Sequence, residues 1–342
     1  MGMPEYKVRI EPHGRYIAVS AERSVLEGAL AAGLNLPHSC KSGHCASCRA
    51  RLRSGQIDYP QGIPAGLTAP EIESGHILLC QARARSDLVV EARFVASVAD
   101  VEIKTLPCRI ARLQPLAPDV MQVFLRLPAV ETLRFHPGQY LDILLEGGRR
   151  RSFSIASPPH DSDLLELHVR RVVGGEFTER LFHVSAVGSL LRLEGPIGQF
   201  VYQEDPQRPL LMIAGGTGFA PLKSMLRHIL EGGSERPIHL YWGARQAWDV
   251  YEEGVVLGWV RKCPQLKFTA VLSEAEQAQA SHHRLGWVHE IVLADHPSLA
   301  PFDVYAAGPP ALIEAIRTTF PRQGVQEGHL FFDSFDYADD GR

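Results

Sequence analysis

The chain has 342 residues, of which 45% are hydrophobic and 22% are charged, and its formal net charge is −4. This composition is typical of globular proteins, and the length predicts two or three domains rather than one core. The small negative charge gives no electrostatic basis for a general affinity for nucleic acid or anionic membranes. Because the first ten residues contain no continuous apolar run, we expect no secretory signal and a cytoplasmic location.

Three segments with different patterns follow one another along the chain. The first predicts strands at residues 6–10 and 16–19 and a helix over 25–32, with Ser24 as its N-cap and Glu27 as the capping-box partner. The second has short strands broken by glycine and proline and almost no helical periodicity, which predicts an antiparallel barrel. The third alternates strands (210–214, 239–242, 304–307) with helices (221–230, 311–320), which predicts a parallel sheet.

Two changes in composition give the expected domain boundaries. Residues 94–104 lack helical periodicity, and residues 205–209 form a turn-rich stretch before an apolar strand. We therefore expect domains over residues 1–98, 103–204 and 206–342.

Six cysteines in a chain without an export signal are expected to be reduced thiols or metal ligands rather than disulfides. Cys40, Cys45 and Cys48 have the spacing C-x4-C-x2-C, and Cys80 follows later, which is the plant-type [2Fe–2S] ferredoxin pattern. A structural zinc and four unrelated thiols are the alternatives. Zinc sites usually use two C-x2-C pairs, whereas this chain has only one, and unrelated thiols rarely have this spacing by chance. We expect these four cysteines to hold the cluster, and Cys108 and Cys263 to be core thiols.

Three arginines follow the cysteine loop with a period of two: Arg49, Arg51 and Arg53. On a strand they project from one face. A solvated strand face is the plainer interpretation, and a basic docking patch for an acidic acceptor protein is the functional alternative.

Four motifs in order carry a family resemblance in the middle segment. They are H-P-G-Q-Y at 136–140, R-S-F-S at 151–154, G-G-E-F-T at 174–178 and E-G-P-I-G-Q-F at 194–200. They resemble the flavin-binding motifs of the ferredoxin–NADP reductase superfamily. A flavin dinucleotide needs a cation and clustered donors for its diphosphate, which Arg151, the glycine amides and the Thr178 hydroxyl can supply. The residues implied by the resemblance are Arg151, Ser152, Phe153, Ser154, Gly174, Gly175, Phe177 and Thr178.

The resemblance gives Ser154 a catalytic role at the flavin N5 region, where hydride arrives. The C-terminal run F-F-D-S-F at 331–335 resembles the ending of bacterial relatives, in which an aromatic side chain lies over the flavin. Phe335 is the candidate for this role. A hydrophobic tail tucked into the last domain is the alternative.

The last segment contains I-A-G-G-T-G-F-A-P at 213–221, which resembles the nicotinamide-binding loop of the same superfamily. A loop between a strand and a helix needs glycines so that a diphosphate can approach backbone amides at the helix N-terminus. Two further motifs, Y-W-G-A-R at 241–245 and Y-A-A-G-P-P at 305–310, resemble the adenosine and nicotinamide contacts. The implied residues are Gly215, Gly216, Thr217, Gly218, Pro221, Arg245, Gly308 and Pro309.

Two departures from the superfamily pattern concern the nicotinamide. Ala307 stands where relatives usually have a cysteine, which predicts slower or differently tuned hydride transfer. Glu274 stands where NADPH-specific relatives often have an arginine, and its carboxylate would repel the 2′-phosphate. We therefore expect a preference for NADH over NADPH, although Arg245 argues mildly the other way.

The resemblance covers nearly the whole chain and implies a multidomain α+β fold. Its parts are a β-grasp ferredoxin domain, an antiparallel Greek-key flavin-binding β-barrel and an α/β nicotinamide-binding domain with a parallel sheet. Reductase components of bacterial oxygenases and the CDP-6-deoxy-3,4-glucoseen reductase group share this order. The implied function is an NAD(P)H-dependent oxidoreductase that passes electrons through FAD and a [2Fe–2S] cluster to an acceptor protein, either an oxygenase component or a sugar dehydratase. A free flavin or quinone reductase and a redox-sensing module with little turnover remain alternatives.

Overall fold

The computed structural model describes residues 4–12, 14–34, 36–38, 40–92, 101–161, 163–204, 208–274 and 282–335. The chain forms two compact units, one from the described residues up to Val101 with Ser334 and Phe335, the other from Glu102–Asp333. Most of the first expected boundary, and residues 205–207 of the second, lie outside the described residues.

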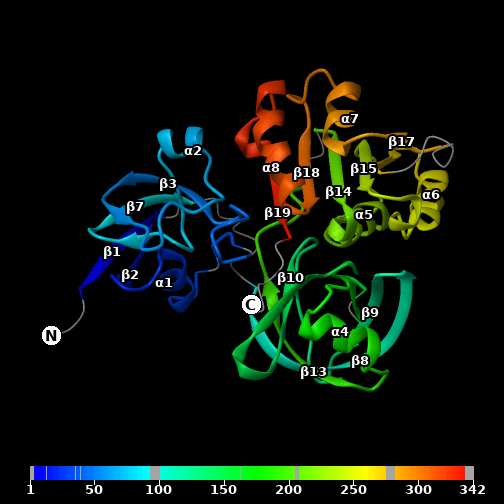
Figure 1. Ribbon diagram of the computed structural model, residues 1–342, viewed down its shortest axis with the longest axis horizontal. Helices are drawn as coiled ribbons and strands as arrows, with labels where there is room; N and C mark the ends of the chain where they lie inside the picture. Colours follow the sequence, from blue (N-terminus) through cyan, green and yellow to red (C-terminus); the bar gives the residue numbers. More distant parts are fainter. Residues whose placement is uncertain are drawn as a thin grey trace. The chain divides into compact units, whose positions relative to one another are not determined.

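The first unit is a mixed five-stranded sheet with strand order β2-β1-β7-β3-β5 (Figure 1). β1 and β7 are parallel, and the remaining pairs are antiparallel. The strands are β1 (Glu5–Glu11), β2 (Arg15–Ser20), β3 (Arg49–Ser54), β5 (His76–Leu78) and β7 (Leu88–Ala92), and β4 (Ile57–Asp58) pairs separately with β6 (Arg83–Ala84).

The helices of this unit are α1 (Val25–Ala31) and α2 (Ala69–Glu73). The predicted cap of α1 is confirmed, because the Glu27 amide donates to Ser24 Oγ and the Ser24 amide donates to Glu27 Oε2. The buried face of α1, which includes Val25 and Leu26, belongs to the core of the sheet.

The first part of the second unit is an antiparallel barrel with strand order β11-β10-β13-β8-β9-β12. A bridge between Ile155 and Leu167 joins the end of β11 to β12 and closes the sheet. The strands are β8 (Lys104–Ala117), β9 (Val120–Arg126), β10 (Tyr140–Leu144), β11 (Arg150–Ser154), β12 (Leu165–Arg170) and β13 (Leu190–Ile197), with the short helix η1 at Glu146–Gly148. The barrel also carries helix α4 (Glu176–His183), which the sequence pattern does not predict.

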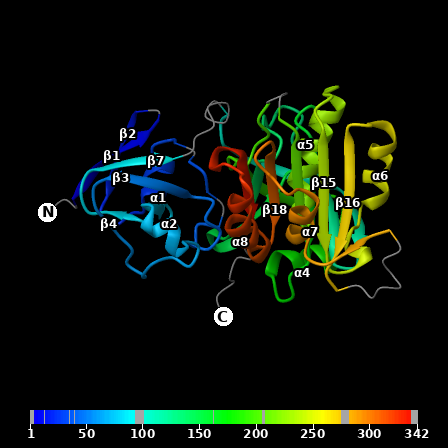
Figure 2. The ribbon, with the colours of Figure 1, turned by 90° about the horizontal axis from the view of Figure 1, so that it is seen from above.

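The second part is a six-stranded sheet with order β17-β16-β15-β14-β18-β19, and its pairs from β17 to β18 are parallel. The strands are β14 (Leu210–Gly215), β15 (Ile238–Ala244), β16 (Leu266–Leu272), β17 (Arg284–Leu285), β18 (Asp303–Gly308) and β19 (Leu330–Ser334). The helices are α5 (Phe219–Glu231), α6 (Glu253–Lys262), α7 (Val288–Asp295) and α8 (Pro310–Thr319), with short turns η2 (Gly216–Gly218), η3 (Ala247–Asp249), η5 (Phe320–Gln323) and η6 (Glu327–His329). In Figure 2, α8 lies next to β18, and it contacts α7, which packs against β15 and β16.

The strand order of this sheet reverses between β14 and β18. The expected glycine loop at 213–221 connects the end of β14 to α5, and the motif at 305–310 spans the end of β18 and the start of α8. Open parallel sheets bind ligands at such a switch point, outside the carboxyl ends of the strands. The predicted multidomain α+β fold with a parallel nicotinamide-domain sheet is therefore confirmed.

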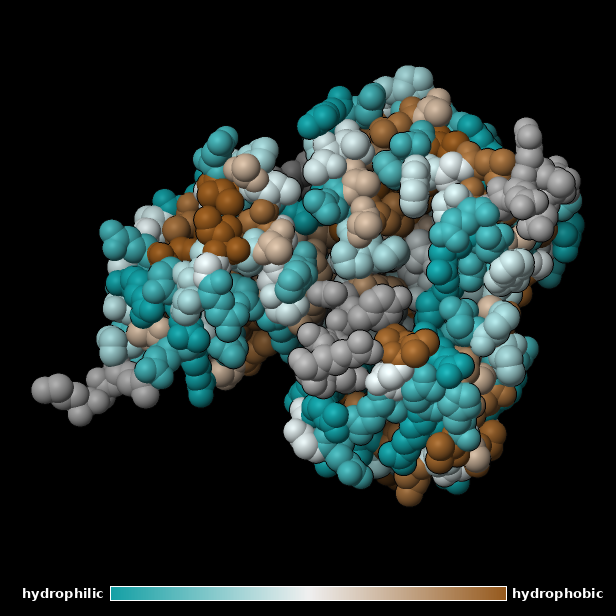
Figure 3. Space-filling model, viewed as in Figure 1, coloured by the Kyte–Doolittle hydropathy of each residue, from teal (hydrophilic) through white to brown (hydrophobic). Residues whose placement is uncertain are grey.

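Within the described parts of the chain, no helix is both long and apolar enough to cross a membrane. On the face drawn in Figure 3, hydrophobic residues form separate patches among hydrophilic ones.

Candidate functional site

The four predicted cluster ligands come together around one loop of the first unit. Backbone amides in this loop approach the sulfurs: the amides of Ser42 and Cys45 each lie 3.4 Å from Cys40 Sγ, and the amide of Ser47 lies 3.5 Å from Cys45 Sγ. The tight path needs left-handed backbone at Lys41 (φ 56°) and Ala46 (φ 57°). Such strain in non-glycine residues persists where the surroundings demand one conformation.

The thiols fall into two hydrogen-bonded pairs. The bond from Cys45 lowers the pKa of Cys40 to about 4, and the bond from Cys48 lowers the pKa of Cys80. The same contacts, together with burial, raise the pKa of Cys45 and Cys48. Two pairs of cysteine ligands suit two tetrahedral irons with two thiolates each.

The cysteine loop has no space for a side chain at Gly43. A Cβ added to Gly43, whose φ is +84°, would lie 2.9 Å from both Gln81 Cγ and Pro64 Cβ. Ser47 Oγ is buried, and no described residue hydrogen-bonds it. A buried hydroxyl without a partner among the described residues of this loop can donate a hydrogen bond to a sulfur ligand, so the residues present fit a [2Fe–2S] cluster.

The three arginines after the loop are engaged in contacts on their own unit. Arg49 pairs with Glu71, Arg53 pairs with Glu91, and Arg51 Nε donates to the Ser74 carbonyl. These contacts support the interpretation as a solvated strand face, and docking of an acceptor there stays a hypothesis.

In the barrel, β11 carries the predicted flavin-binding residues. Ser154 is buried at the end of β11, where it pairs with Tyr140 of β10. Ser152 Oγ, on the same face of β11 as Ser154, donates to Asp142 Oδ1 of β10 at 2.6 Å, which ties the two strands together. The ring of Phe153 packs on Phe177 of α4 at a centroid distance of 5.3 Å. The contact between these two rings therefore packs the R-S-F-S strand against the helix that begins at the glycine pair.

Gly174 and Gly175 form the turn that begins α4. Gly174 has φ +78°, and Gly175 is the N-cap of α4. Thr178 Oγ1 accepts a hydrogen bond from the Val172 amide and donates to the Val172 carbonyl, so its hydroxyl stabilises this turn. A contact between Thr178 and a diphosphate stays a prediction. The N-terminus of α4 beside Gly174 and Gly175 suits an anionic diphosphate.

The nicotinamide loop joins β14 to α5 through η2. Gly216 has φ +53°, and a Cβ added there would meet only Arg170 Nη2, at 3.7 Å. Gly215 and Gly308 are close-packed on each other, since a Cβ on Gly308 would lie 2.9 Å from Gly215 Cα. Pro221 is buried in the first turn of α5. In this loop Gly215 is therefore closely packed against Gly308, whereas the space next to Gly216 is more open.

The remaining predicted nicotinamide residues lie at the same edge of the sheet or beyond it. Arg245 is exposed after β15, and its carbonyl accepts a hydrogen bond from the Glu274 amide. Glu274 is exposed, so its carboxylate can face a bound nucleotide. Phe335 follows β19 and belongs to the unit of the cluster loop. Its place over a flavin stays a prediction.

A buried set of charged residues was missed by the sequence reading: Glu166, His168, Lys223 and Glu252. They come from β12, from α5 and from the residue before α6, and they lie between the barrel and the nicotinamide domain. The run Leu165–Arg170 (LELHVR) alternates apolar and polar residues. In a barrel strand this alternation indicates that Glu166, His168 and Arg170 share the face opposite to the barrel core.

Three family models match the chain in the expected order. They are the 2Fe-2S iron-sulfur cluster binding domain over residues 8–85, the oxidoreductase FAD-binding domain over 107–202, and the oxidoreductase NAD-binding domain over 212–318.

Relatives match over almost their whole length. The CDP-6-deoxy-L-threo-D-glycero-4-hexulose-3-dehydrase reductase of Yersinia pestis is 35% identical, with 96% of this chain and 98% of that protein covered. Terephthalate 1,2-dioxygenase reductase component 1 of Comamonas sp. is 34% identical, with 92% of both chains covered. The structure of the Amycolatopsis cytochrome P450 reductase GcoB has a TM-score of 0.76 at 32% identity, covering 98% of this chain and 100% of that one.

The predicted resemblance, cofactors and enzyme class are thus confirmed by matches to all three domains. The chain belongs to the family of NAD(P)H-dependent iron–sulfur flavoprotein reductases that join a 2Fe-2S domain, an FAD-binding domain and an NAD-binding domain in one polypeptide.

Proposed function

We propose that this reductase prefers NADH and delivers electrons one at a time to a protein acceptor, a sugar dehydratase of the kind served by its Yersinia relative. The observation that supports transfer of single electrons to the acceptor is the cysteine loop, which has four thiols in two pairs and backbone amides directed at the sulfurs. A free flavin or quinone reductase has no use for such a loop.

In this scheme each part of the chain has a separate task. The glycines at 215–218 admit the nicotinamide dinucleotide, Arg151 and the Gly174–Gly175 turn bind the flavin diphosphate, and Ser154 orients the reacting ring. FAD, when bound, accepts a hydride and releases electrons singly to an iron–sulfur cluster. Cys40, Cys45, Cys48 and Cys80 hold that cluster and tune it through the amides of their loop.

The sugar dehydratase is supported by similarity over 98% of the Yersinia reductase, with all three domains aligned. An oxygenase component is a second candidate, because the Comamonas reductase is 34% identical and GcoB has the same fold over its full chain. The two acceptor classes share one reductase mechanism and differ in the surface that docks on the first domain.

The test compares reduction of two purified acceptors under anaerobic conditions, a CDP-6-deoxy-4-hexulose-3-dehydrase of the kind named for the Yersinia reductase and the oxygenase component of a terephthalate 1,2-dioxygenase. We expect faster NADH-dependent turnover of the sugar substrate with the dehydratase. Turnover only with the oxygenase would replace the dehydratase by the second candidate.

The role of the cluster is tested separately with Cys48→Ser, and Cys263→Ser serves as the control. We expect Cys48→Ser to keep NADH–ferricyanide activity and to lose protein-directed electron transfer along with its iron. Equal reduction of free FMN and of protein acceptors in both variants would favour the free flavin reductase instead.

A further inference from the structure

We propose that the buried network of Glu166, His168, Lys223 and Glu252 is a positioning device that fixes the nicotinamide domain on the flavin barrel for hydride transfer. It acts on the first step of the reaction, so the proposal does not depend on which acceptor the protein serves.

Lys223 is the centre of the network. Its Nζ lies 2.7 Å from Glu166 Oε1 and 2.7 Å from both carboxylate oxygens of Glu252. The three side chains are only 5–7% exposed. Glu166 belongs to β12 of the barrel, whereas Lys223 and Glu252 belong to the nicotinamide domain. One ammonium group thus joins a carboxylate of the flavin barrel to a carboxylate of the nicotinamide domain across their interface.

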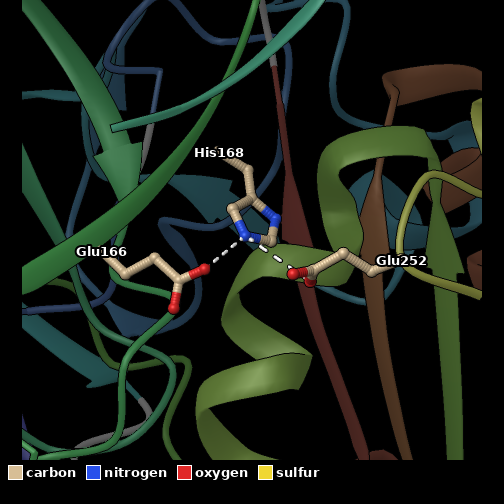
Figure 4. Close-up of side chains that lie close together, drawn as sticks. All are labelled: Glu166, His168 and Glu252. Atoms are coloured by element: carbon tan, nitrogen blue, oxygen red, sulfur yellow. Dashed lines mark hydrogen bonds and ion pairs between the residues drawn. The ribbon is translucent and has the colours of Figure 1, made fainter. Parts of the chain in front are cut away.

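His168 completes the network from the strand position two residues after Glu166. Its Nε2 lies 2.9 Å from Glu166 Oε1, and its Nδ1 lies 3.0 Å from the Tyr251 hydroxyl (Figure 4 shows the two glutamates and the histidine). Burial alone would raise the pKa of Glu166, but the bonds from His168 and Lys223 lower that pKa well below its usual value. Glu166 is therefore a carboxylate that depends on these partners.

The network of Glu166, His168, Lys223 and Glu252 needs no metal ion to balance its buried carboxylates. Ligand atoms of Glu166, His168 and Glu252 lie within 4.8 Å of one another, as in a metal site. However, the Lys223 ammonium donates to both carboxylates and supplies the positive charge that a metal would supply.

The network connects directly to the two cofactor-binding segments. Lys223 lies in α5, which begins immediately after the glycines of η2. The next residue, Ser224, donates from Oγ to the Ser157 carbonyl at 2.7 Å, three residues after Ser154 of the flavin strand. On the same helix, Met225 packs against Gly138, where an added Cβ would lie 2.3 Å from Met225 Cε and 2.2 Å from the Phe200 carbonyl oxygen, and where φ is +102°.

The contact extends along β12. Arg170 pairs with Asp119 of the barrel at 2.8 Å and with Asp249 of the nicotinamide domain at 3.4 Å. Residues 166, 168 and 170 project from one face of the strand, because side chains alternate along it. This face therefore touches α5, the Tyr251–Glu252 segment and η3. Arg170 also reaches the nicotinamide loop, since a Cβ on Gly216 would lie 3.7 Å from its Nη2.

Buried ion pairs contribute little net stability, but removing one partner leaves an uncompensated charge. Hydride transfer requires donor and acceptor atoms in near-contact geometry, and small displacements lower its rate strongly. A network that permits one docking geometry is therefore suited to set this distance.

The experiment uses the full holoenzyme with Lys223→Met, Glu252→Gln and the double variant Lys223→Met/Glu252→Gln. The double variant restores the net charge of the wild-type network without its bridge. Arg227→Gln is the matched control, since Arg227 lies on the same helix and pairs with the barrel residue Asp161 at the surface.

We expect the limiting rate of flavin reduction by NADH in stopped flow to fall about 10- to 100-fold in Lys223→Met and in the double variant. Affinity for NAD⁺ should change less than about twofold, because the nucleotide contacts remain. Amide hydrogen exchange of β12 and α5 should become faster in Lys223→Met and in the double variant but not in Arg227→Gln. The melting temperature should fall in Lys223→Met and recover in the double variant.

If the flavin-reduction rate recovers together with the melting temperature in the double variant, the network serves only to balance buried charge, and the proposal is overturned. A wild-type rate in Lys223→Met would do the same.

Discussion

A Cβ added to Gly218 would lie 1.9 Å from the carbonyl oxygen of Ala307. Gly218 ends the turn after β14, and Ala307 lies near the end of β18, so the ends of two adjacent parallel strands meet here. No side chain fits at this crossing, and backbone atoms cannot move aside as a flexible side chain can. Gly218 is therefore required by the packing that forms the nicotinamide loop.

Gly218→Ala should separate the two strand ends and disturb the loop. We expect NAD⁺ affinity to fall at least about tenfold and the protein to lose about 2–4 kcal/mol of stability, as for an overpacked or strained core. Isothermal titration with NAD⁺ and thermal unfolding measure the two effects. Gly258→Ala is the control: Gly258 lies within α6, the nearest group to its added Cβ is Arg261 Nη2 at 3.7 Å, and we expect a gain of about 0.5–1 kcal/mol. Normal NAD⁺ binding by Gly218→Ala would contradict this account.

Local signals predicted much of this fold. The Ser24–Glu27 capping box and the alternation of strands and helices after residue 210 are encoded by neighbouring residues, and both are confirmed. The spacing of the four cysteines likewise predicted a site whose ligands the structure brings together. Helix α4 was missed because its eight residues follow a glycine pair among strands. The network around Lys223 was missed because residues 166, 223 and 252 meet only in the tertiary fold.

Ala307→Cys tests the departure from the superfamily pattern at the nicotinamide site. Ala307 is fully buried, and its carbonyl oxygen is the atom that a Cβ on Gly218 of the loop would meet. We expect flavin reduction by NADH to become about two- to tenfold faster, a gain of up to about 1.4 kcal/mol in transition-state stabilisation. Stopped-flow absorbance measures the rate. Ala306→Cys, on the opposite face of β18, should give no acceleration, and equal effects of both variants would remove the orienting role from position 307.

Glu274→Arg tests the preference for NADH. The exposed carboxylate at this position follows β16, and Gln246 Nε2 donates to its backbone carbonyl at 2.9 Å, which holds the main chain in place. Replacing the carboxylate by a guanidinium should raise kcat/KM for NADPH at least about tenfold, because a 2′-phosphate then meets a cation instead of an anion. The ratio of kcat/KM values for NADPH and NADH is the measurement. Glu290→Arg, on the exposed side of α7, should leave that ratio unchanged. A wild-type enzyme that prefers NADPH would contradict the assignment.

Acid should destabilise the nicotinamide domain through His239. Burial and the positive field of His296 lower the pKa of His239 from 6.5 to about 4, with Lys267 acting in the same direction and Asp295 against it. Its Nε2 lies 2.9 Å from Thr269 Oγ1. The unfolded chain takes up a proton as the pH falls below 6.5, whereas the folded protein does not until about pH 4.

The stability associated with neutral His239 is thus fully present above pH 6.5 and is lost as the pH falls toward 4. Because the ring is partly exposed, we expect about 1 kcal/mol of loss between pH 7 and pH 5 from this residue. Urea unfolding at both pH values should give a smaller pH dependence for His239→Gln than for the wild type. His183→Gln, which replaces an exposed histidine of α4, should keep the wild-type dependence. An unchanged dependence in His239→Gln would assign the acid sensitivity to other groups.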